Sequence, residues 1–264
     1  MSAADNPDAR RQEKALWRHF SEGVRHFRLI GEGDHILLGL SGGKDSLALL
    51  ALLGQATRRS GGRWRVTALH VRIDSVRYES DTAYLEARAA DAGVPLLVET
   101  IHVEADRKAR RSPCFLCAWE RRKALFNTAQ RLGCNKVALG HHQDDILLTA
   151  LMNLTYCGTF STMPARLTMR KFPVTIIRPL CMVREAELTA YAQRHNLTPV
   201  VKTCIYDKAS TRAAVREVFA LQERLNPEYR YSLWHALIKS GALVQETDDA
   251  DGRAHRGFAD ATAE

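Results

Sequence analysis

The sequence predicts an α/β fold built on a doubly wound, mostly parallel five-stranded sheet. Short apolar runs of strand length alternate with longer stretches whose apolar residues recur at helical spacing. The short runs are apolar at nearly every position, which is typical of parallel strands buried on both faces. A chain of 264 residues with 45% hydrophobic residues can bury a sizeable core, either as one domain with extensions or as two small domains.

The N-terminal region predicts a short tail and one amphipathic helix. Residues 1–10 are polar and terminal, so we expect disorder there. Residues 11–30 form the expected helix, because apolar residues recur near helical spacing at Leu16, Phe20, Val24 and Phe27. A glycine-containing turn at 31–34 ends this element.

The nucleotide-binding domain is expected to span residues 31–202. The five apolar runs that we interpret as strands are 35–40, 64–73, 95–103, 136–139 and 174–178. The helices expected between or after them are 44–57, 80–92, 118–132, 145–154 and 184–195. Residues 104–120 interrupt the alternation as a basic insertion, residues 156–171 are expected to form a loop, and 197–201 have the composition of a short strand.

The C-terminal part predicts a helical extension over residues 203–244. A basic helix is expected at 210–225 and a second helix at 227–242, with Trp234 and Leu237 on its apolar side. Residues 245–264 are acidic and rich in small residues, so we expect a disordered tail.

A glycine-rich loop between the first strand and its helix is the main functional motif. Its glycines allow close backbone approach to an anion, and the next amides lie at a helix N-terminus, where negative charge is stabilised. Hydroxyls and a lysine add further phosphate donors. The spacing is not that of the GxxxxGK[ST] loop; it resembles the SGGxDS loop of the PP-loop ATP pyrophosphatases. The six residues of the loop, all expected to bind ATP, are Ser41, Gly42, Gly43, Lys44, Asp45 and Ser46.

Two further polar groups follow strands and should meet the loop, because ligands of parallel sheets bind at the carboxyl ends of strands. His70 ends the second strand, and Gly140 opens a Gly-His-His-Gln-Asp-Asp segment after the fourth; both are expected near the nucleotide. Carboxylates beside a polyphosphate are suitable ligands for Mg²⁺. The candidates are Asp45, Asp144 and Asp145. For the last two, N-capping of the following helix is the alternative, and His141 and His142 fit either a ligand contact or a structural role.

The six cysteines divide into two groups. Cys114 and Cys117 form a CxxC pair, which suits one metal site or a redox pair, and Cys204 lies in a polar context before a basic helix. A zinc site normally has four protein ligands, whereas iron–sulfur clusters are also held by thiolates. The other three, which we interpret as packed thiols, are Cys134, Cys157 and Cys181.

Charge and hydropathy restrict the partners and the compartment. A net charge of +8 fits an anionic partner such as nucleic acid, although charge alone is weak support. No apolar stretch reaches the roughly 18 residues of a membrane span, and residues 1–14 lack the apolar core of a signal peptide. We therefore expect a cytoplasmic protein without membrane attachment.

The order of the motifs resembles that of one family. The SGGKDS loop, the basic CxxC stretch, LGHHQDDIL at 139–147, IIRPL at 176–180 and a later single cysteine occur in that sequence. This pattern, from about residue 20 to 217, is similar to that of the TtcA family, the tRNA-cytidine(32) 2-sulfurtransferases. The resemblance implies that Cys114, Cys117 and Cys204 hold a [4Fe-4S] cluster. One departure is local, since this chain has a single cysteine at 203–206 where family members often have CxxC.

The resemblance also implies a reaction. With ATP and Mg²⁺ bound, the C2 oxygen of a cytidine attacks the α-phosphorus, pyrophosphate leaves, and sulfur carried on the cluster replaces AMP. Lys44, Asp45 and Asp145 are the residues expected to act in it. The implied partners are tRNA, a sulfur donor such as a cysteine desulfurase, and a second copy in a homodimer. Candidates for tRNA phosphate contact are Arg107, Lys108, Arg110, Arg111, Arg121, Arg122, Arg212 and Arg216.

Three alternatives stay open on sequence grounds. The chain could be a related PP-loop tRNA modifier, such as a lysidine synthetase or a 2-thiouridine enzyme. It could transfer sulfur through a persulfide on Cys117 or Cys204 without a cluster. It could also be a cluster-bearing RNA-binding or redox-sensing protein whose nucleotide loop is vestigial, although the intact loop and the Asp144–Asp145 pair disfavour this.

Overall fold

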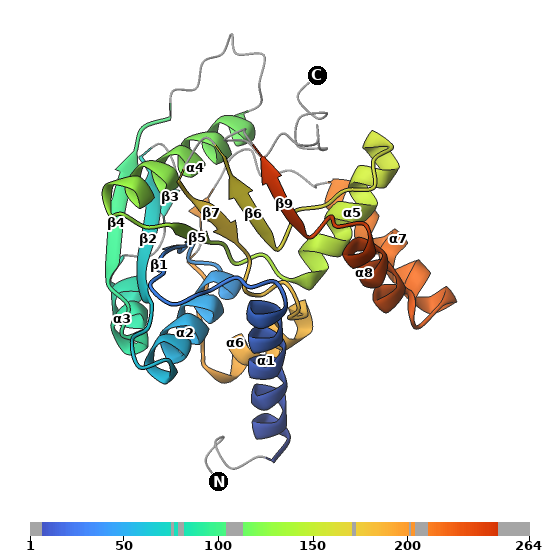
Figure 1. Ribbon diagram of the computed structural model, residues 1–264, viewed down its shortest axis with the longest axis horizontal. Coiled ribbons are helices and arrows are strands. Elements are labelled where there is room, and N and C mark those ends of the chain that lie inside the picture. Colours follow the sequence, from blue (N-terminus) through green and yellow to red (C-terminus); the bar gives the residue numbers. More distant parts are fainter. Residues whose placement is uncertain are drawn as a thin grey trace.

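The computed structural model of the chain describes residues 7–74, 77–78, 82–103, 113–170, 173–200, 202–203 and 211–247. Helices flank a central twisted sheet (Figure 1). The helices are α1 (Pro7–His26), α2 (Lys44–Arg59), α3 (Ala83–Ala92), α4 (Pro113–Arg131), α5 (Gln143–Cys157), α6 (Glu185–Arg194), α7 (Thr211–Leu225) and α8 (Tyr229–Lys239). The strands are β1 (His35–Gly39), β2 (Arg65–Ile73), β3 (Arg77–Tyr78), β4 (Leu96–Ile101), β5 (Lys136–Ala138), β6 (Arg166–Met169), β7 (Thr175–Ile177), β8 (Lys202–Thr203) and β9 (Val244–Thr247).

The main sheet confirms the predicted α/β class but has seven strands rather than five. Its order is β4-β2-β1-β5-β7-β6-β9. The five predicted strands form the parallel block β4-β2-β1-β5-β7. The two added strands were expected as loop and tail: β6 pairs antiparallel with β7, and β9 pairs with β6. Both have only four residues, too few for a clear apolar pattern.

Both faces of the sheet are covered, as doubly wound folds require. Along β1, Ile36 and Leu38 join the core cluster under α2, while Leu37 joins a second cluster with Ala129 of α4 on the opposite face. All three side chains are fully buried. This arrangement explains why β1 is a continuous apolar run without polar alternation.

The terminal helices belong to the same core as the sheet. Phe20 of α1, Phe219 of α7 and Leu237 of α8 lie in one hydrophobic cluster with the leucines of α2. The segment expected as a C-terminal extension is thus packed into the domain. The helix α1 begins at Pro7, inside the expected tail, and ends at His26, before residue 30.

Two segments near the predicted cysteine positions differ from expectation. The helix α4 begins at Pro113 rather than 118, so the Cys114–Cys117 pair lies in its first turns and only 104–112 of the insertion fall outside the described residues. Proline suits the first helical position because its missing amide hydrogen is not needed there. The short strand lies at 202–203 rather than 197–201 and pairs with Arg77 and Tyr78 of β3. No helix within the described ranges is long and apolar enough to span a membrane.

Candidate active site

The glycine-rich loop connects the carboxyl end of β1 to the N-terminus of α2. Hydroxyl groups close the loop on itself: the Ser41 hydroxyl donates to Ser46 Oγ at 3.0 Å, and the Ser46 hydroxyl donates to the Gly43 carbonyl at 2.9 Å. Gly43 is the extended residue before α2, so the following amides lie at the free end of the helix. The loop is therefore ordered for anion binding by its own side chains.

Gly42 is required where the loop turns. Its φ of +83° lies in the left-handed region, and a Cβ at this position would lie 2.8 Å from two carbon atoms of Val200. The Val200 amide also donates to the Gly42 carbonyl at 2.9 Å. The segment that follows α6 consequently covers the loop, a contact that the sequence did not reveal.

His70, on β2, contacts the residue that precedes the loop. It is only 2% exposed, and its Nδ1 lies 2.7 Å from the carbonyl oxygen of Leu40, the residue that precedes the loop. The contact places His70 directly beneath the start of the loop, and its proximity to the nucleotide stays a prediction.

Gly140 brings the second motif against the first. A Cβ on Gly140 would lie 3.2 Å from the backbone nitrogen of Ser46 and 3.3 Å from its Cα. Such contacts are tighter than side chains normally make, so the close approach of the two backbones depends on glycine. The SGGKDS and GHHQDD segments therefore lie in contact at one edge of the sheet, as predicted.

Lys44 lies between two carboxylates. Its Nζ is 2.9 Å from Asp45 Oδ1 and 3.5 Å from Glu185 Oε1 at the start of α6. Burial alone would lower the pKa of Lys44, but the hydrogen bond and charge of Asp45, with the charge of Glu185, outweigh burial and raise it. Lys44 is thus a fixed positive charge beside the loop.

The carboxylates that start α5 are held by arginines of α7 and α8. Asp144 Oδ1 lies 2.8 Å from Arg230, and its Oδ2 accepts the Glu185 amide at 2.7 Å. Burial would raise the pKa of Asp144, but the Glu185 amide and Arg230 together lower it. Asp145 Oδ1 lies 2.6 Å from Arg212.

The capping alternative is observed for Asp145 but not for Asp144, whose carboxylate accepts the amide of Glu185 in α6. Asp145 Oδ2 accepts the His142 amide at 3.1 Å, across the first turn of α5. No group of three or more His, Cys, Asp or Glu in the described residues is arranged to hold a metal ion. A Mg²⁺ ion shared with phosphates needs only one or two carboxylates, so Asp45, Asp144 and Asp145 stay predictions as Mg²⁺ ligands.

The two histidines of the motif differ in environment. His141 Nδ1 accepts from the buried Arg178 at 3.3 Å. Burial, reinforced by the charges of Arg178, Arg212 and Arg122, lowers the pKa of His141 to about 3, so it is neutral at physiological pH. His142 is buried, with its ring nitrogens 3.6 Å from Asp144 and 3.5 Å from Asp145.

Two of the three cysteines that we interpreted as packed thiols are buried, whereas Cys157 is not. Cys134 and Cys181 are buried, and burial raises their pKa values to about 11 and about 12, which keeps both as unreactive thiols. Cys157 is half-buried at the end of α5. Cys117 is also half-buried, in α4. The side chain of Cys114 and all of Cys204 lie outside the described residues.

The predicted RNA-contacting residues fall into three groups. Residues 107–111 lie outside the described ranges. On α4, Arg121 is half-buried and Arg122 is exposed. On α7, Arg212 and Arg216 contact carboxylates of the site, with Arg216 lying 3.4 Å from Glu185.

Four residues of this site were missed from the sequence. Glu185 follows the fifth predicted strand and opens the next helix, so the rule that sites form at strand carboxyl ends could have identified it. Arg178, inside the IIRPL segment, lies at the end of the fifth predicted strand, so the same rule could have identified it. Arg230 and Val200 carry no local signal, because only tertiary packing brings them to the motifs.

Comparisons with known proteins agree with this geometry. Residues 14–222 match the family model of the PP-loop domain. A tRNA-cytidine(32) 2-sulfurtransferase of Geobacter metallireducens is 38% identical over 221 residues, covering 81% of this chain and 85% of the relative. Another from Anaeromyxobacter sp. (strain K) is 32% identical and covers 96% and 86%.

A solved structure shares the fold. The U34-tRNA thiolase NcsA from Methanococcus maripaludis, determined with its [4Fe-4S] cluster, aligns with a TM-score of 0.68. It is 23% identical and covers 87% of this chain and 79% of the thiolase. The structural likeness supports the fold, and the sequence relatives determine the family: this chain belongs to the tRNA-cytidine(32) 2-sulfurtransferases and is built on a PP-loop domain.

Proposed function

We propose that the protein is an ATP-dependent tRNA sulfurtransferase that converts a cytidine, at position 32 of the tRNA, to 2-thiocytidine. The observation that carries this proposal is the contact between the SGGKDS loop and the GHHQDD segment through Gly140. That contact puts helix N-terminal amides, Lys44 and paired carboxylates at one sheet edge. The family relatives, which are named for this reaction, support the choice of base.

The residues of the loop perform the activation step. The loop amides and Lys44 hold the phosphates of ATP, while Mg²⁺ on Asp45, Asp144 or Asp145 would neutralise further charge. The C2 oxygen of cytidine attacks the α-phosphorus, and the bond to pyrophosphate breaks. The carbonyl oxygen on C2 of the base is a poor leaving group until AMP is attached to it, which is why the reaction consumes ATP.

Lys44 and Arg212 could each contact either a carboxylate of the site or a phosphate of ATP. In the structure, Asp45 binds Lys44 and Asp145 binds Arg212. A divalent ion on these carboxylates would compete with both cations and make them available to the phosphates. The neutral His141 adds no positive charge here, so its ring can donate or accept a hydrogen bond without repelling the arginines.

The second step needs a sulfur carrier. A [4Fe-4S] cluster on three cysteines would leave one iron open to carry sulfur. Cys117 fits a ligand role, since it is half-buried on α4, the helix that also carries Arg122, whose charge acts on His141. Thr203, which precedes Cys204, is held by its pairing with Arg77. Cys114, Cys117 and Cys204 are therefore proposed as the ligands on the CxxC spacing and the later single cysteine of the sequence, and of the three only the Cys117 side chain lies within the described residues.

Nucleoside analysis tests the function. We expect 2-thiocytidine to disappear from the tRNA of a deletion strain and to return with the wild-type chain but not with Lys44→Ala. Unchanged 2-thiocytidine after deletion would contradict the proposal. The same analysis would reveal a different thiolated base. Light scattering on the same protein preparations would test whether the protein forms the expected homodimer.

A matched pair of variants tests the cluster. Cys117 and Cys157 are both half-buried, so Cys117→Ser and Cys157→Ser disturb packing to a similar degree. After anaerobic purification we expect about four iron and four sulfide per chain in the Cys157 variant and loss of both in the Cys117 variant. Colourless wild-type protein with full activity would instead favour a cysteine persulfide, for which a cysteine desulfurase is the expected donor.

A further inference from the structure

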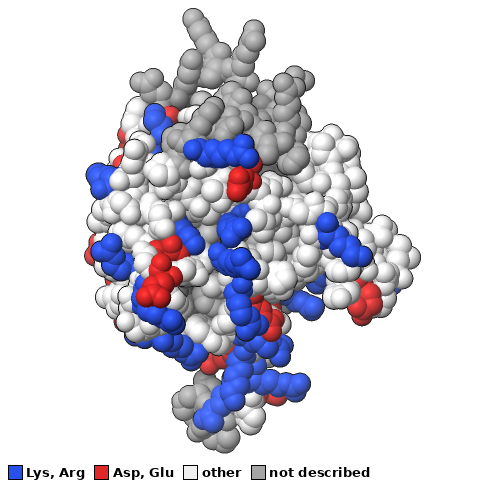
Figure 2. Space-filling model, viewed as in Figure 1, with Lys and Arg blue, Asp and Glu red and all other residues white. Residues whose placement is uncertain are grey.

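A stripe of basic side chains runs along the exposed side of α1. Arg11, Lys14, Arg18 and Arg25 are all exposed. At 3.6 residues per turn they fall within about 60° of the helix circumference and extend over about 21 Å. Figure 2 shows Lys and Arg side chains gathered in a band along this helix. We call these four residues the α1 stripe.

The α1 stripe has no carboxylate partner in the part of the chain that the structure describes. Within the described ranges, none of its four side chains forms an ion pair with a carboxylate. The acidic residue Glu13 of the same helix is directed away from it, because its carboxylate lies 2.6 Å from His195 next to α6. Glu22 also lies on this side of α1, one turn from Arg18 and from Arg25, but no ion pair joins it to either in the described structure. The α1 stripe therefore carries a net positive charge among the residues that the structure describes.

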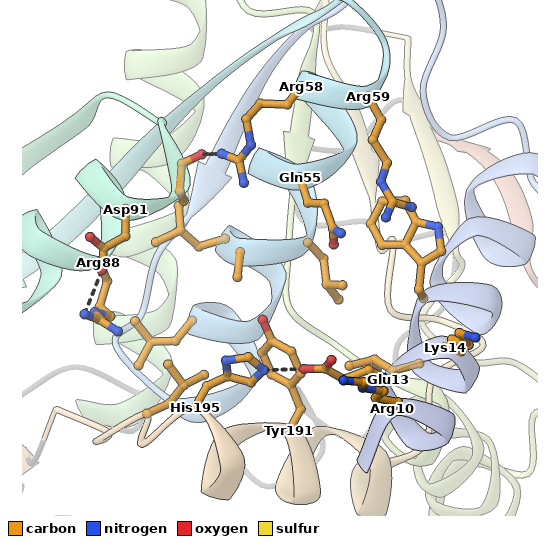
Figure 3. A pocket seen from close by; sticks show the side chains of 18 residues that line it. Arg10, Glu13, Lys14, Gln55, Arg58, Arg59, Arg88, Asp91, Tyr191 and His195 are labelled. Atoms are coloured by element: carbon orange, nitrogen blue, oxygen red, sulfur yellow. Dashed lines mark hydrogen bonds and ion pairs between the residues drawn. The ribbon is translucent and has the colours of Figure 1, made fainter. Parts of the chain in front are cut away.

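A cavity of about 780 Å³ adjoins the stripe between α1, α2, α3 and α6. Figure 3 shows the basic side chains on its rim: Arg10, Lys14, Arg58, Arg59 and Arg88. Only two acidic residues, Glu13 and Asp91, are among the residues that line it.

Lys14 belongs to both features, so the stripe and the rim form one basic surface. Arg59 lies with its guanidinium 4.2 Å from the ring centre of Trp17. The lining continues along α2 to Leu47, next to Ser46 of the phosphate loop. The basic residues that α2 adds to this lining, Arg58 and Arg59, lie at the end of α2 away from the loop, and the lining nearer to the loop is apolar.

We propose that the α1 stripe and the rim of this cavity bind the phosphate backbone of the tRNA substrate; this inference rests on the proposed function. Arg212 and Arg216, which the sequence suggested for this task, are already paired with Asp145 and Glu185. The α1 stripe offers cations without such partners. A chain of phosphates is the occupant that matches a row of positive charges about 21 Å long.

Salt-dependent binding of an unmodified tRNA transcript tests the inference. Each phosphate contact contributes about 0.7–0.9 to the slope of log K against log salt. The variant Arg11→Glu, Lys14→Glu, Arg18→Glu should reduce that slope by about 2–3 and weaken binding at least about tenfold at low salt. Affinity for ATP should not change, because these residues lie away from the loop.

The matched control changes the same total charge elsewhere. Arg63→Glu, Arg224→Glu, Lys239→Glu replaces three exposed cations outside α1. It should keep the wild-type slope within about 0.5. Equal slopes and affinities for the two triple variants would overturn the inference. A glutamine version of the stripe variant, with its helix content checked by circular dichroism, guards against an effect of misfolding.

The two proposals can fail separately. If wild-type protein thiolates the transcript but the stripe variant binds it normally, only the inference fails. If wild-type protein forms no 2-thiocytidine, the proposed function fails, and the salt slopes still report whether α1 contacts RNA.

Discussion

Gly42→Ala should distort the phosphate loop for two separable reasons. An alanine at φ +83° adopts a left-handed backbone, which costs about 1–2 kcal/mol. Its Cβ would also lie 2.8 Å from Val200, and overpacking of this kind costs about 1–3 kcal/mol. The sum, about 2–5 kcal/mol, corresponds to a fall in melting temperature of about 4–20 °C for a chain of this size.

A double variant separates the two costs. Val200→Ala removes Cγ2, one of the two atoms that would lie 2.8 Å from a Cβ on residue 42, and keeps the other, its own Cβ. Gly42→Ala with Val200→Ala should therefore recover part of the overpacking cost and leave the backbone strain. The assays are thermal unfolding and calorimetric titration with ATP, where we expect the order wild type, double variant, Gly42→Ala. A double variant whose loss equals the sum of the two single losses would refute the close contact between the loop and residue 200.

Two further predictions concern groups away from the loop. Asp34 is buried beside Lys136 at 2.7 Å; burial would raise its pKa, but Lys136 and the Gly31 amide lower it. The contribution of the pair to stability is fully present above the ordinary pKa near 3.8 and is lost progressively as the pH falls from there through the lowered pKa of Asp34 in the folded state. Asp34→Asn should therefore cost about 3 kcal/mol at pH 7 in urea unfolding, and progressively less as the pH is lowered below 3.8. In iron-free protein, iodoacetamide at pH 8 should label Cys117 and Cys157 but not Cys181, whose thiol has a pKa of about 12; mass spectrometry would detect a contrary result.

The parallel block of the sheet was predictable because its signals are local. Residues 35–40 are apolar at nearly every position, and β1 is buried on both faces between α2 and α4. The strands β6 and β9 were missed because each has four residues and gains its stability from pairing with a neighbour. The sequence of neither segment, 166–169 or 244–247, contains a pattern that predicts its pairing with the other.

The site was predictable to the same extent. Ser41 to Ser46 and Gly140 to Asp145 are contiguous motifs whose chemistry depends on residue type and spacing. Arg230 reaches Asp144 only because α8 packs near α5, and His70 is buried because β2 lies inside the sheet, between β4 and β1. Sequence reasoning named the chemical groups but could not say which of them face the ligand.

The segment between α6 and α7 links the two halves of the proposed reaction. Val200 covers Gly42 of the phosphate loop, and Thr203 pairs with β3. After residues 204–210, Arg212 binds Asp145. The described residues on either side of 204–210 therefore contact the activation site or β3. A change in the loop on ATP binding would act on Val200 first, so we expect nucleotide occupancy to be coupled to the pairing of Thr203 with β3 and to the contact between Arg212 and Asp145.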